Sequence, residues 1–353
     1  MIRRLFPVLL AINLLLGLLP ASQPAQGQTP AFEIYLPLVQ GSSDPIYSYL
    51  AQVSPDQLTE YASDLVIQYG PRHPAYNRVF IDDHCTLGTT LYTNNNLHRS
   101  SKYVEAELNT FGYIVYREYV PNENGAFNVA AMRWGTVYPN IFIEVGAHID
   151  SQPGTPGASD NASGTAAVLE LARVLKDYPS RYSLRFLTFI NEEYGLRGSR
   201  YHAQQVVNNG EGIKAALVLD GIGWSEIAPQ HMNCIWDAND PETMRIADLF
   251  DQMRTLYQID IGWRRCAPTS NQFSDNAAYW EQGLAAVLSI GGLPYADPNY
   301  HKCGDSMNAI DMQNVYKTTL ENLAVLLTLD GEEPGAVPLR LELPWMVEPV
   351  EGH

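Results

Sequence analysis

The sequence predicts an α/β fold with a mixed, mostly parallel central sheet and helices on both faces of it. Short apolar runs that suit buried strands alternate along the chain with stretches whose apolar residues recur at helical spacing. The length of 353 residues allows one large domain, and the apolar fraction of 46% is typical of a globular protein. We expect a single domain over residues 54–330, a linker or N-terminal extension over residues 28–53, and a C-terminal tail over residues 331–353.

The first half of the domain is expected to contain two helices followed by three strands. Pro55 suits the first turn of a helix, and apolar residues then recur at helical spacing. Residues 98–111 show the same spacing, with Val104 and Leu108 on one face. Three β-rich runs follow and are expected to be strands: residues 114–120, 127–134 and 141–149.

From residue 161 onward, expected helices and strands alternate. The expected helices are residues 161–177, 198–207, 241–257, 276–282 and 310–329. The expected strands are residues 184–191, 213–220, 258–263 and 284–290. This alternation predicts helices on both faces of the sheet, and in such sheets functional side chains gather at the carboxyl ends of the strands.

The first 27 residues have the pattern of an export signal. Arg3 and Arg4 precede an apolar run, residues 5–19, and small residues follow Pro20. A single membrane anchor is the alternative, but the run is shorter than the roughly 20 residues that a membrane span requires. We therefore expect a secreted or otherwise extracytoplasmic protein that has no membrane attachment once the signal is removed.

Charge and cysteine content exclude several kinds of partner and scaffold. Lys and Arg total 22 against 39 Asp and Glu, so the formal charge is −17 and a basic face toward nucleic acid is not expected. Four cysteines are too few for a disulfide-built scaffold, and no CxxC spacing suggests a cysteine-type metal site. In an oxidising compartment we expect Cys266 to pair with Cys303, because both flank segments that are expected to meet at one site. Free buried cysteines are the alternative.

Two of the expected strands end in side chains that bind metals in other proteins. The strand 141–149 ends in His148 and Asp150, which lie on the same face because strand side chains alternate. A metal-binding His commonly donates its second ring N–H to a carboxylate, although a satisfied polar pair is the simpler explanation. A later strand ends in Glu192 and Glu193, which repel each other when buried unless a cation lies nearby. A solvated pair in a loop is the alternative.

Three further residues of this kind occur at the ends of other elements. Asp160 precedes a helix and would otherwise be a helix cap, Asp220 follows an apolar strand, and His301 lies in the loop before the last helix. Three carboxylates and two imidazoles are enough to hold two zinc ions if one carboxylate is shared. One of the two adjacent glutamates then remains free to act as a base beside a two-metal site.

In these residues the sequence resembles the zinc aminopeptidases of peptidase family M28, the co-catalytic di-zinc exopeptidases of clan MH. The matching motifs are Ala147-His148-Ile149-Asp150-Ser151, Ser159-Asp160-Asn161-Ala162-Ser163-Gly164, Asn191-Glu192-Glu193-Tyr194-Gly195-Leu196-Arg197-Gly198-Ser199, Leu219-Asp220, and Tyr300-His301 with Asp305. The resemblance covers about residues 54–329. It implies the zinc-exopeptidase fold and a hydrolase that removes N-terminal residues from peptides.

The resemblance also implies a role for each ligand. His148 and Asp220 would bind one zinc ion, Glu193 and His301 would bind the other, and Asp160 would bridge both. The substrates would be peptides with a free N-terminus, because carboxylates that the metals do not fully compensate attract an α-ammonium group. With one ligand pair for each ion and Asp160 shared, the resemblance implies two zinc ions per chain.

Three more residues receive roles in catalysis from the same resemblance. Glu192 would be the general base that takes a proton from the metal-bridging water and later delivers it to the leaving amine. Asp150 would orient His148, and Tyr300 would donate a hydrogen bond to the developing oxyanion. The peptide bond between Asp160 and Asn161 is expected to be cis.

Other functions stay open at this stage. A carboxypeptidase or dipeptidase needs a basic group for the substrate carboxylate, and Arg197, Arg264 and Arg265 are candidates. A glutaminyl cyclase on the same scaffold is expected to lose part of the two-metal ligand set, and an inactive binding domain is not expected to keep Glu192. The segment 274–276 departs from the family, because Ser-Asp-Asn stands where many members have Ser-Asp-His. We expect a monomer.

Overall fold

The computed structural model describes residues 44–73, 95–225, 232–236, 240–266, 274–292 and 296–334. For residues 95, 232–236 and 263–266 it describes the backbone only. All of these residues belong to one compact unit, residues 35–353. The predicted export signal and most of the predicted C-terminal tail lie outside the described residues and stay predictions. Among the described residues, no helix is long and apolar enough to cross a membrane.

Helices and strands alternate along the chain, as the sequence predicted. The helices and helical turns of the described residues are α1 (Pro45–Leu50), α2 (Pro55–Ser63), η1 (Asp64–Gln68), α3 (Asn95–Thr110), η2 (Ala158–Ala162), α4 (Ser163–Leu175), α5 (Arg197–Asn208), α6 (Pro241–Leu256), α7 (Asn276–Trp280) and α8 (Met312–Gly331). The strands are β1 (Ile114–Tyr119), β2 (Phe127–Arg133), β3 (Tyr138–His148), β4 (Tyr182–Phe189), β5 (Gly212–Leu219), β6 (Met232–Trp236), β7 (Gly262–Cys266) and β8 (Ala286–Ile290).

Capping residues explain where several helices begin. Ser54 accepts a hydrogen bond from the N–H of Gln57 at the start of α2, and Pro55 occupies the first helical position. Asp311 accepts hydrogen bonds from the N–H groups of Gln313 and Asn314 at the start of α8. These side chains satisfy N–H groups that the first turn of a helix leaves without a partner.

Eight strands of the described residues form one sheet, in the order β1-β2-β4-β3-β5-β8-β6-β7. The central strands β4, β3, β5 and β8 are parallel to one another. At one edge β1 and β2 pair in antiparallel fashion, and at the other edge β6 runs antiparallel to β8 and parallel to β7. The mixed, mostly parallel sheet that the sequence predicted is therefore confirmed.

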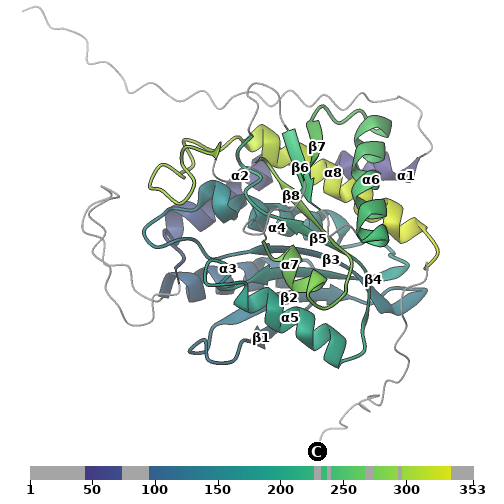
Figure 1. Ribbon diagram of the computed structural model, residues 1–353, viewed down its shortest axis with the longest axis horizontal. Helices are drawn as coiled ribbons and strands as arrows, with labels where there is room; N and C mark the ends of the chain where they lie inside the picture. Colours follow the sequence, from purple (N-terminus) through teal and green to yellow (C-terminus); the bar gives the residue numbers. More distant parts are fainter. Residues whose placement is uncertain are drawn as a thin grey trace, which may run out of the picture. The chain divides into compact units, whose positions relative to one another are not determined.

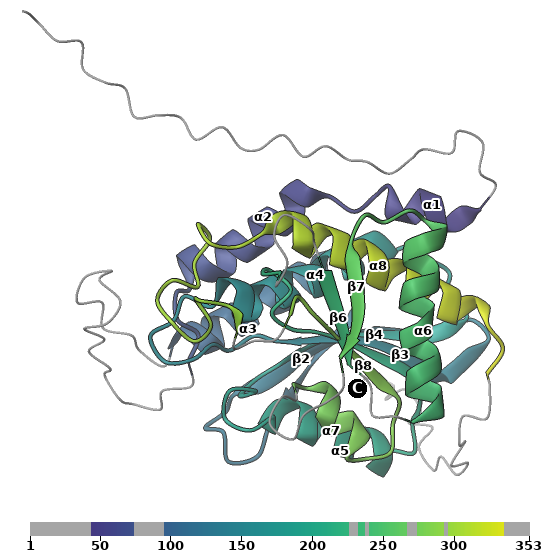
Figure 2. The ribbon, with the colours of Figure 1, turned by 45° about the horizontal axis from the view of Figure 1, so that its top comes forward.

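Helices cover both faces of this sheet (Figure 2). On one face α4 and α8 pack against the sheet with α2 outside them, and on the other face lie α5 and α7. The larger hydrophobic core lies under α4 and α8, with buried residues such as Val145, Leu171 and Leu323. A smaller core, which includes Phe189 and Ala203, lies between the sheet and the pair α5 and α7.

The structure differs from the sequence-based expectations at three places. Strand β6 was not expected, and the strand expected at residues 258–263 lies instead at β7. Both strands are only five residues long. Strand β6 pairs with β8 and with β7, so the place of both strands in the sheet depends on segments that are distant in the sequence. The packed fold also begins before the expected boundary at residue 54, because α1 places the side chain of Leu50 in the main core.

The parallel strands β3, β4 and β5 are neighbours in the sheet, so their carboxyl ends lie side by side (Figure 1). The register pairs His148, the last residue of β3, with Phe189, the last residue of β4. Strand β5 is the other neighbour of β3 and ends at Leu219, directly before Asp220. The polar residues that follow these strands therefore emerge side by side, as expected for the carboxyl ends of parallel strands.

Candidate metal centre

The first group of candidate ligands consists of His148, Asp160 and Asp220. The Nε2 atom of His148 lies 3.2 Å from Oδ1 of Asp220 and 3.3 Å from Oδ1 of Asp160. One ligand atom from each residue falls within 4.8 Å of the others, which is close enough to surround a single ion. The side chain of His148 is buried, and the two carboxylates are slightly exposed.

The second group consists of Asp160, Glu193 and His301. The Nε2 atom of His301 lies 3.1 Å from Oδ2 of Asp160 and 3.3 Å from Oε2 of Glu193. These ligand atoms also fall within 4.8 Å of one another. Asp160 thus offers one carboxylate oxygen to each group, and the structure brings together all five residues that the sequence analysis singled out as ligands, in the two groupings that the resemblance implied.

The backbone around Asp160 is held by the side chain of Asn161. The peptide bond between these two residues is cis, as the resemblance implied. The amide of Asn161 donates a hydrogen bond to the carbonyl of Leu219 (2.9 Å), and its oxygen accepts one from the N–H of Gly164 (2.9 Å). Because Leu219 directly precedes Asp220, one side chain links the segments that carry two ligands of the first group.

Asp150 contacts His148 and also the backbone of Glu192 and Glu193. Its carbonyl oxygen is 3.2 Å from Nδ1 of His148, and its carboxylate is 3.6 Å from the same atom. The carboxylate also accepts hydrogen bonds from the N–H groups of Glu192 (3.1 Å) and Glu193 (3.3 Å). The predicted role of Asp150 in orienting His148 is therefore compatible with the geometry, and a second contact, to the glutamate loop, was not predicted.

The carboxylates of Glu192 and Glu193 are buried near other carboxylates, and their raised pKa values show the effect. Burial and the nearby charge of Asp160 raise the pKa of Glu193 to about 7. Burial, together with repulsion from Glu193 and Asp220, raises the pKa of Glu192 well above its usual range, although His148 opposes the shift. Such repulsion is relieved when a cation is bound among the carboxylates.

The pKa values of the two histidines are also raised, but for a histidine a raised pKa favours the charged form. Burial lowers the pKa of His148, but the carboxylates of Asp220 and Glu192 outweigh it and raise the pKa well above its usual value. Asp160 and Glu193 likewise raise the pKa of His301 to about 10 in spite of its burial. A metal ion binds the neutral imidazole and would take the place of these protons.

The donor set fits zinc. Carboxylate oxygens and imidazole nitrogens are ligands that zinc accepts in proteins. Within the described residues, the buried Oε1 atom of Glu193 has no hydrogen-bond partner, whereas Gln152 donates to its Oε2 atom at 2.6 Å. A buried carboxylate oxygen without a donor is expected where a metal ion is to be bound.

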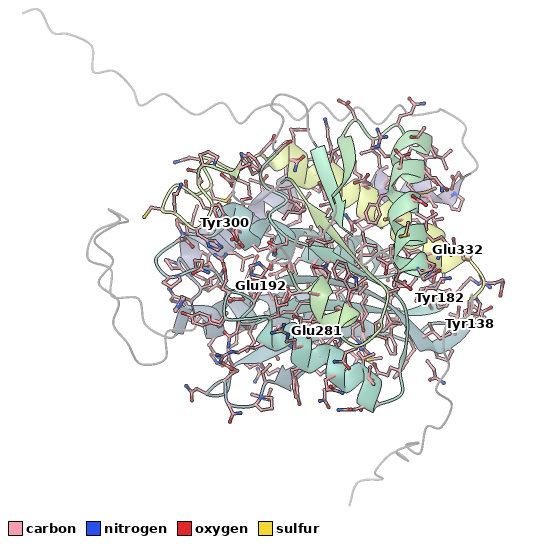
Figure 3. All side chains as sticks on the ribbon, viewed as in Figure 1. Tyr138, Tyr182, Glu192, Glu281, Tyr300 and Glu332 are labelled. Atoms are coloured by element: carbon pink, nitrogen blue, oxygen red, sulfur yellow. The ribbon has the colours of Figure 1, made fainter. Side chains whose placement is uncertain are left out.

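Glu192 and Tyr300, the residues predicted to act on the substrate, are labelled in Figure 3. Both lie close enough to the two ligand groups for carboxylates of those groups to raise their pKa values. Glu192 follows β4 and is partly exposed, and Tyr300 lies in the loop before α8, where its ring stacks on the ring of His301 at 3.6 Å. Burial and the charge of Asp160 raise the pKa of Tyr300 above its usual value, so its hydroxyl stays protonated. The residue at the departure from the family, Asn276, is fully buried at the start of α7.

Two buried residues near the ligands were not assigned a role from the sequence. Arg72 is fully buried and donates hydrogen bonds to carbonyl groups of the loop between β3 and η2. Asp305 was noted as part of a motif, and its carboxylate accepts the N–H groups of Ser159 and Asp160. No spacing rule indicates these contacts, because the partners are backbone atoms far away in the sequence.

The predicted pairing of Cys266 with Cys303 stays untested. Cys303 takes part in a disulfide, but the side chain of Cys266 lies outside the side chains that the structure describes. Residues 267–273 and 293–295 also lie outside the described residues.

Known proteins resemble this chain in sequence and in fold. A model of peptidase family M28 matches residues 128–326. Aminopeptidase YwaD of Bacillus subtilis is 32% identical over 185 residues, which cover 50% of this chain and 38% of that protein. The chain therefore matches well under half of the length of this relative.

Solved structures show the same fold. LapB from Legionella pneumophila aligns with a TM-score of 0.70 at 19% identity, covering 83% of this chain and 77% of that chain. BSAP, a zinc aminopeptidase from Bacillus subtilis, aligns with a TM-score of 0.60 at 16% identity, covering 78% and 95%. A glutaminyl cyclase from Bacteroides thetaiotaomicron also aligns with a TM-score of 0.60, at 18% identity, covering 78% and 98%. At these identities the likeness concerns the fold alone.

Proposed function

The chain belongs to peptidase family M28, and from this premise we propose that it is a zinc-dependent aminopeptidase that hydrolyses N-terminal residues from peptides. The observation that carries the proposal is the pair of ligand groups that share Asp160. Such an arrangement suits two zinc ions per chain, with His148 and Asp220 on one side and Glu193 and His301 on the other. The presence of aminopeptidases among the relatives supports the same activity.

The zinc ions would supply Lewis acidity and lower the pKa of a water molecule at the site toward neutrality. Glu192 takes the proton from the attacking water and delivers it to the leaving amine. Asp150 holds the backbone of Glu192 through a 3.1 Å hydrogen bond, which fixes the base at the end of β4. Tyr300, whose hydroxyl stays protonated, donates a hydrogen bond to the developing oxyanion.

The preference for a free N-terminus follows from charge. The described site contains more carboxylates than cationic side chains, and burial together with repulsion from neighbouring carboxylates raises the pKa values of Glu192 and Glu193. A substrate that brings its own α-ammonium group into this region is attracted, whereas a blocked amine brings no charge. We propose on this ground that the enzyme acts on peptides with a free amino group.

Two alternatives on the same scaffold make different demands. A carboxypeptidase or dipeptidase requires a basic side chain for the substrate carboxylate, but Arg197 already pairs with Glu123 at 2.6 Å. The side chains of Arg264 and Arg265 lie outside the described residues. A glutaminyl cyclase is expected to lack part of the two-metal ligand set, and all five ligands are present here.

A panel of chromogenic substrates tests the proposal. Aminoacyl p-nitroanilides with a free amine, the same compounds with an N-acetyl block, and an N-terminal glutaminyl peptide are offered to the zinc-loaded full chain. We expect the free-amine anilides to be hydrolysed at least tenfold faster than the blocked ones. Equal rates on blocked and free substrates, or cyclisation of the glutaminyl peptide without anilide hydrolysis, would contradict an aminopeptidase.

Export and oligomeric state complete the proposal. The pattern of residues 1–27 supports secretion or another extracytoplasmic location. Sequencing of the mature N-terminus tests this, because a signal predicts cleavage close to residue 27. We further propose that the enzyme acts as a monomer, which light scattering of the purified chain tests.

A further inference from the structure

We propose that Arg72 and Asp305 are positioning residues that hold the segment 149–160, and with it the shared ligand Asp160, in place for metal binding. This inference rests on the proposed metal-dependent function, but its test includes a measurement that needs no metal. Neither residue belongs to the two ligand groups.

Arg72 joins the two ends of the loop that runs from β3 to η2. Its Nε atom donates to the carbonyl of Ile149 (2.7 Å), and its two terminal nitrogens donate to the carbonyls of Pro156 (2.9 Å) and Gly157 (2.7 Å). Its backbone N–H donates to Oγ of Ser151 (3.0 Å). One side chain therefore holds both the residue that follows His148 and the residues that lead into Asp160.

The guanidinium group is suited to this task, and a lysine is not. A guanidinium carries five N–H donors in a rigid plane, so it reaches carbonyls on several sides at once, whereas an ammonium group has three donors on one atom. The buried charge is also placed among acids. Burial lowers the pKa of Arg72 to about 10, and the carboxylates of Asp305, Asp150 and Asp160 oppose this shift, so the group stays charged at neutral pH.

Gly157 provides the space that this arrangement needs. Its φ angle is +64°, a conformation that residues with a side chain rarely adopt. A Cβ atom at this position would lie 2.8 Å from a terminal nitrogen of Arg72 and 2.7 Å from the carbonyl oxygen of Asp160. The close approach of the guanidinium to this segment is thus built into the backbone.

Asp305 holds the end of the same segment that carries Asp160. Its carboxylate accepts hydrogen bonds from the N–H groups of Ser159 (2.6 Å) and Asp160 (3.1 Å), and its carbonyl accepts one from Ala158 (3.3 Å). Asp305 lies four residues after His301, so it connects the loops that carry two ligands of the second group. Partners behind the ligands of a metal site commonly fix ligand position in this way, and their loss weakens metal binding by about 10–100-fold.

The test compares Arg72→Lys with a matched substitution of another buried arginine in the full chain. Arg185 of β4 is also buried and pairs with Glu144 (2.8 Å) and Glu211 (2.6 Å), outside both ligand groups. We expect Arg72→Lys to weaken zinc affinity, measured by competition with a chelator, by about 10–100-fold. Arg185→Lys is expected to lower the unfolding temperature and to keep the zinc affinity of the wild type.

Two further readouts separate positioning from general stability. The visible spectrum of the Co²⁺-loaded protein reports ligand geometry, and it is expected to change in Arg72→Lys and to stay unchanged in Arg185→Lys. Amide hydrogen exchange over residues 149–162 is expected to accelerate in the metal-free Arg72→Lys protein and to stay unchanged in metal-free Arg185→Lys. Asp305→Asn, which keeps one carbonyl acceptor, is the second variant and is expected to shift the same readouts in the same direction.

The outcomes distinguish this inference from the proposed function. Wild-type zinc affinity and an unchanged cobalt spectrum in both the Arg72 and the Asp305 variants would overturn the positioning role. If the wild-type chain bound no zinc, the proposed function would fail, and the exchange rates of segment 149–162 would still decide whether Arg72 holds it. If Arg72→Lys does not fold, Asp305→Asn decides by the same criteria.

Discussion

Replacement of Glu192 by Gln removes the proposed base while it preserves the size of the side chain and all five candidate ligands. The backbone N–H of Glu192, which donates to Asp150 at 3.1 Å, is unaffected by the change. The neutral amide also removes one of the charges that burial and the neighbouring Glu193 make costly, as the raised pKa of Glu192 indicates. The substitution therefore changes proton transfer with little disturbance of the fold.

The size of the effect follows from the two proton transfers that Glu192 performs. General acid–base catalysis by one positioned side chain contributes about 10²–10⁴-fold in rate. Because the same carboxylate serves the attack of water and the departure of the amine, we expect the upper part of this range, a loss of about 10³–10⁴-fold in kcat. This loss corresponds to about 4–5.5 kcal/mol of transition-state stabilisation. Substrate binding does not need the proton, so KM is expected to change much less.

The assay measures kcat and KM on a free-amine aminoacyl anilide at saturating zinc, together with the metal content and the unfolding temperature. The matched control is Glu281→Gln at the end of α7, where an exposed carboxylate pairs with Arg200 at 2.7 Å (Figure 3). The control is expected to keep wild-type turnover. Unchanged turnover in Glu192→Gln with full zinc content would refute the assignment of the base, and loss of zinc would show that Glu192 acts as a ligand instead.

Three further changes have defined outcomes. Asp160→Asn removes one charge from the residue shared by both groups, so metal analysis should find less zinc, and full zinc content would contradict bridging. The carboxylates of Glu118 and Glu144 outweigh the effect of burial and raise the pKa of His202 to about 10. The charged form of His202 therefore adds stability below its usual pKa near 6.5, and this stability is lost as the pH rises through about 10. Urea unfolding should show this loss in the wild type and not in His202→Asn. Gly164→Ala places a Cβ atom 2.4 Å from Oδ1 of Asn161, so thermal unfolding should show a destabilisation of about 1–3 kcal/mol, and an unchanged midpoint would contradict the close approach.

The elements of the central sheet could be predicted because their signals are local. The strands at residues 114–120, 141–149 and 213–220 are rich in apolar residues, and the structure confirms them within a few residues as β1, β3 and β5. Strand β6 escaped prediction because its pairing with β8 and β7 defines it, and such pairing joins segments distant in the sequence. Packing of α1 against the core was also missed, because a helix of six residues is too short to show a clear helical periodicity.

The sequence by itself determined which residues can hold metal. Parallel pairing brings together the histidines and carboxylates at the carboxyl ends of apolar strands. The positions of His148, Glu193 and Asp220 could therefore be inferred from the order of strands and polar residues along the chain. Only the tertiary structure decided how these ligands are held. The side-chain contacts of Arg72 with Ile149 and Gly157 join residues 77 and 85 positions apart, and they end on backbone carbonyls, which every residue type carries. Such partners leave no pattern of residue types in the sequence. The contacts form only in the folded chain, where packing removes the arginine from water and its N–H groups must bond to other groups of the protein.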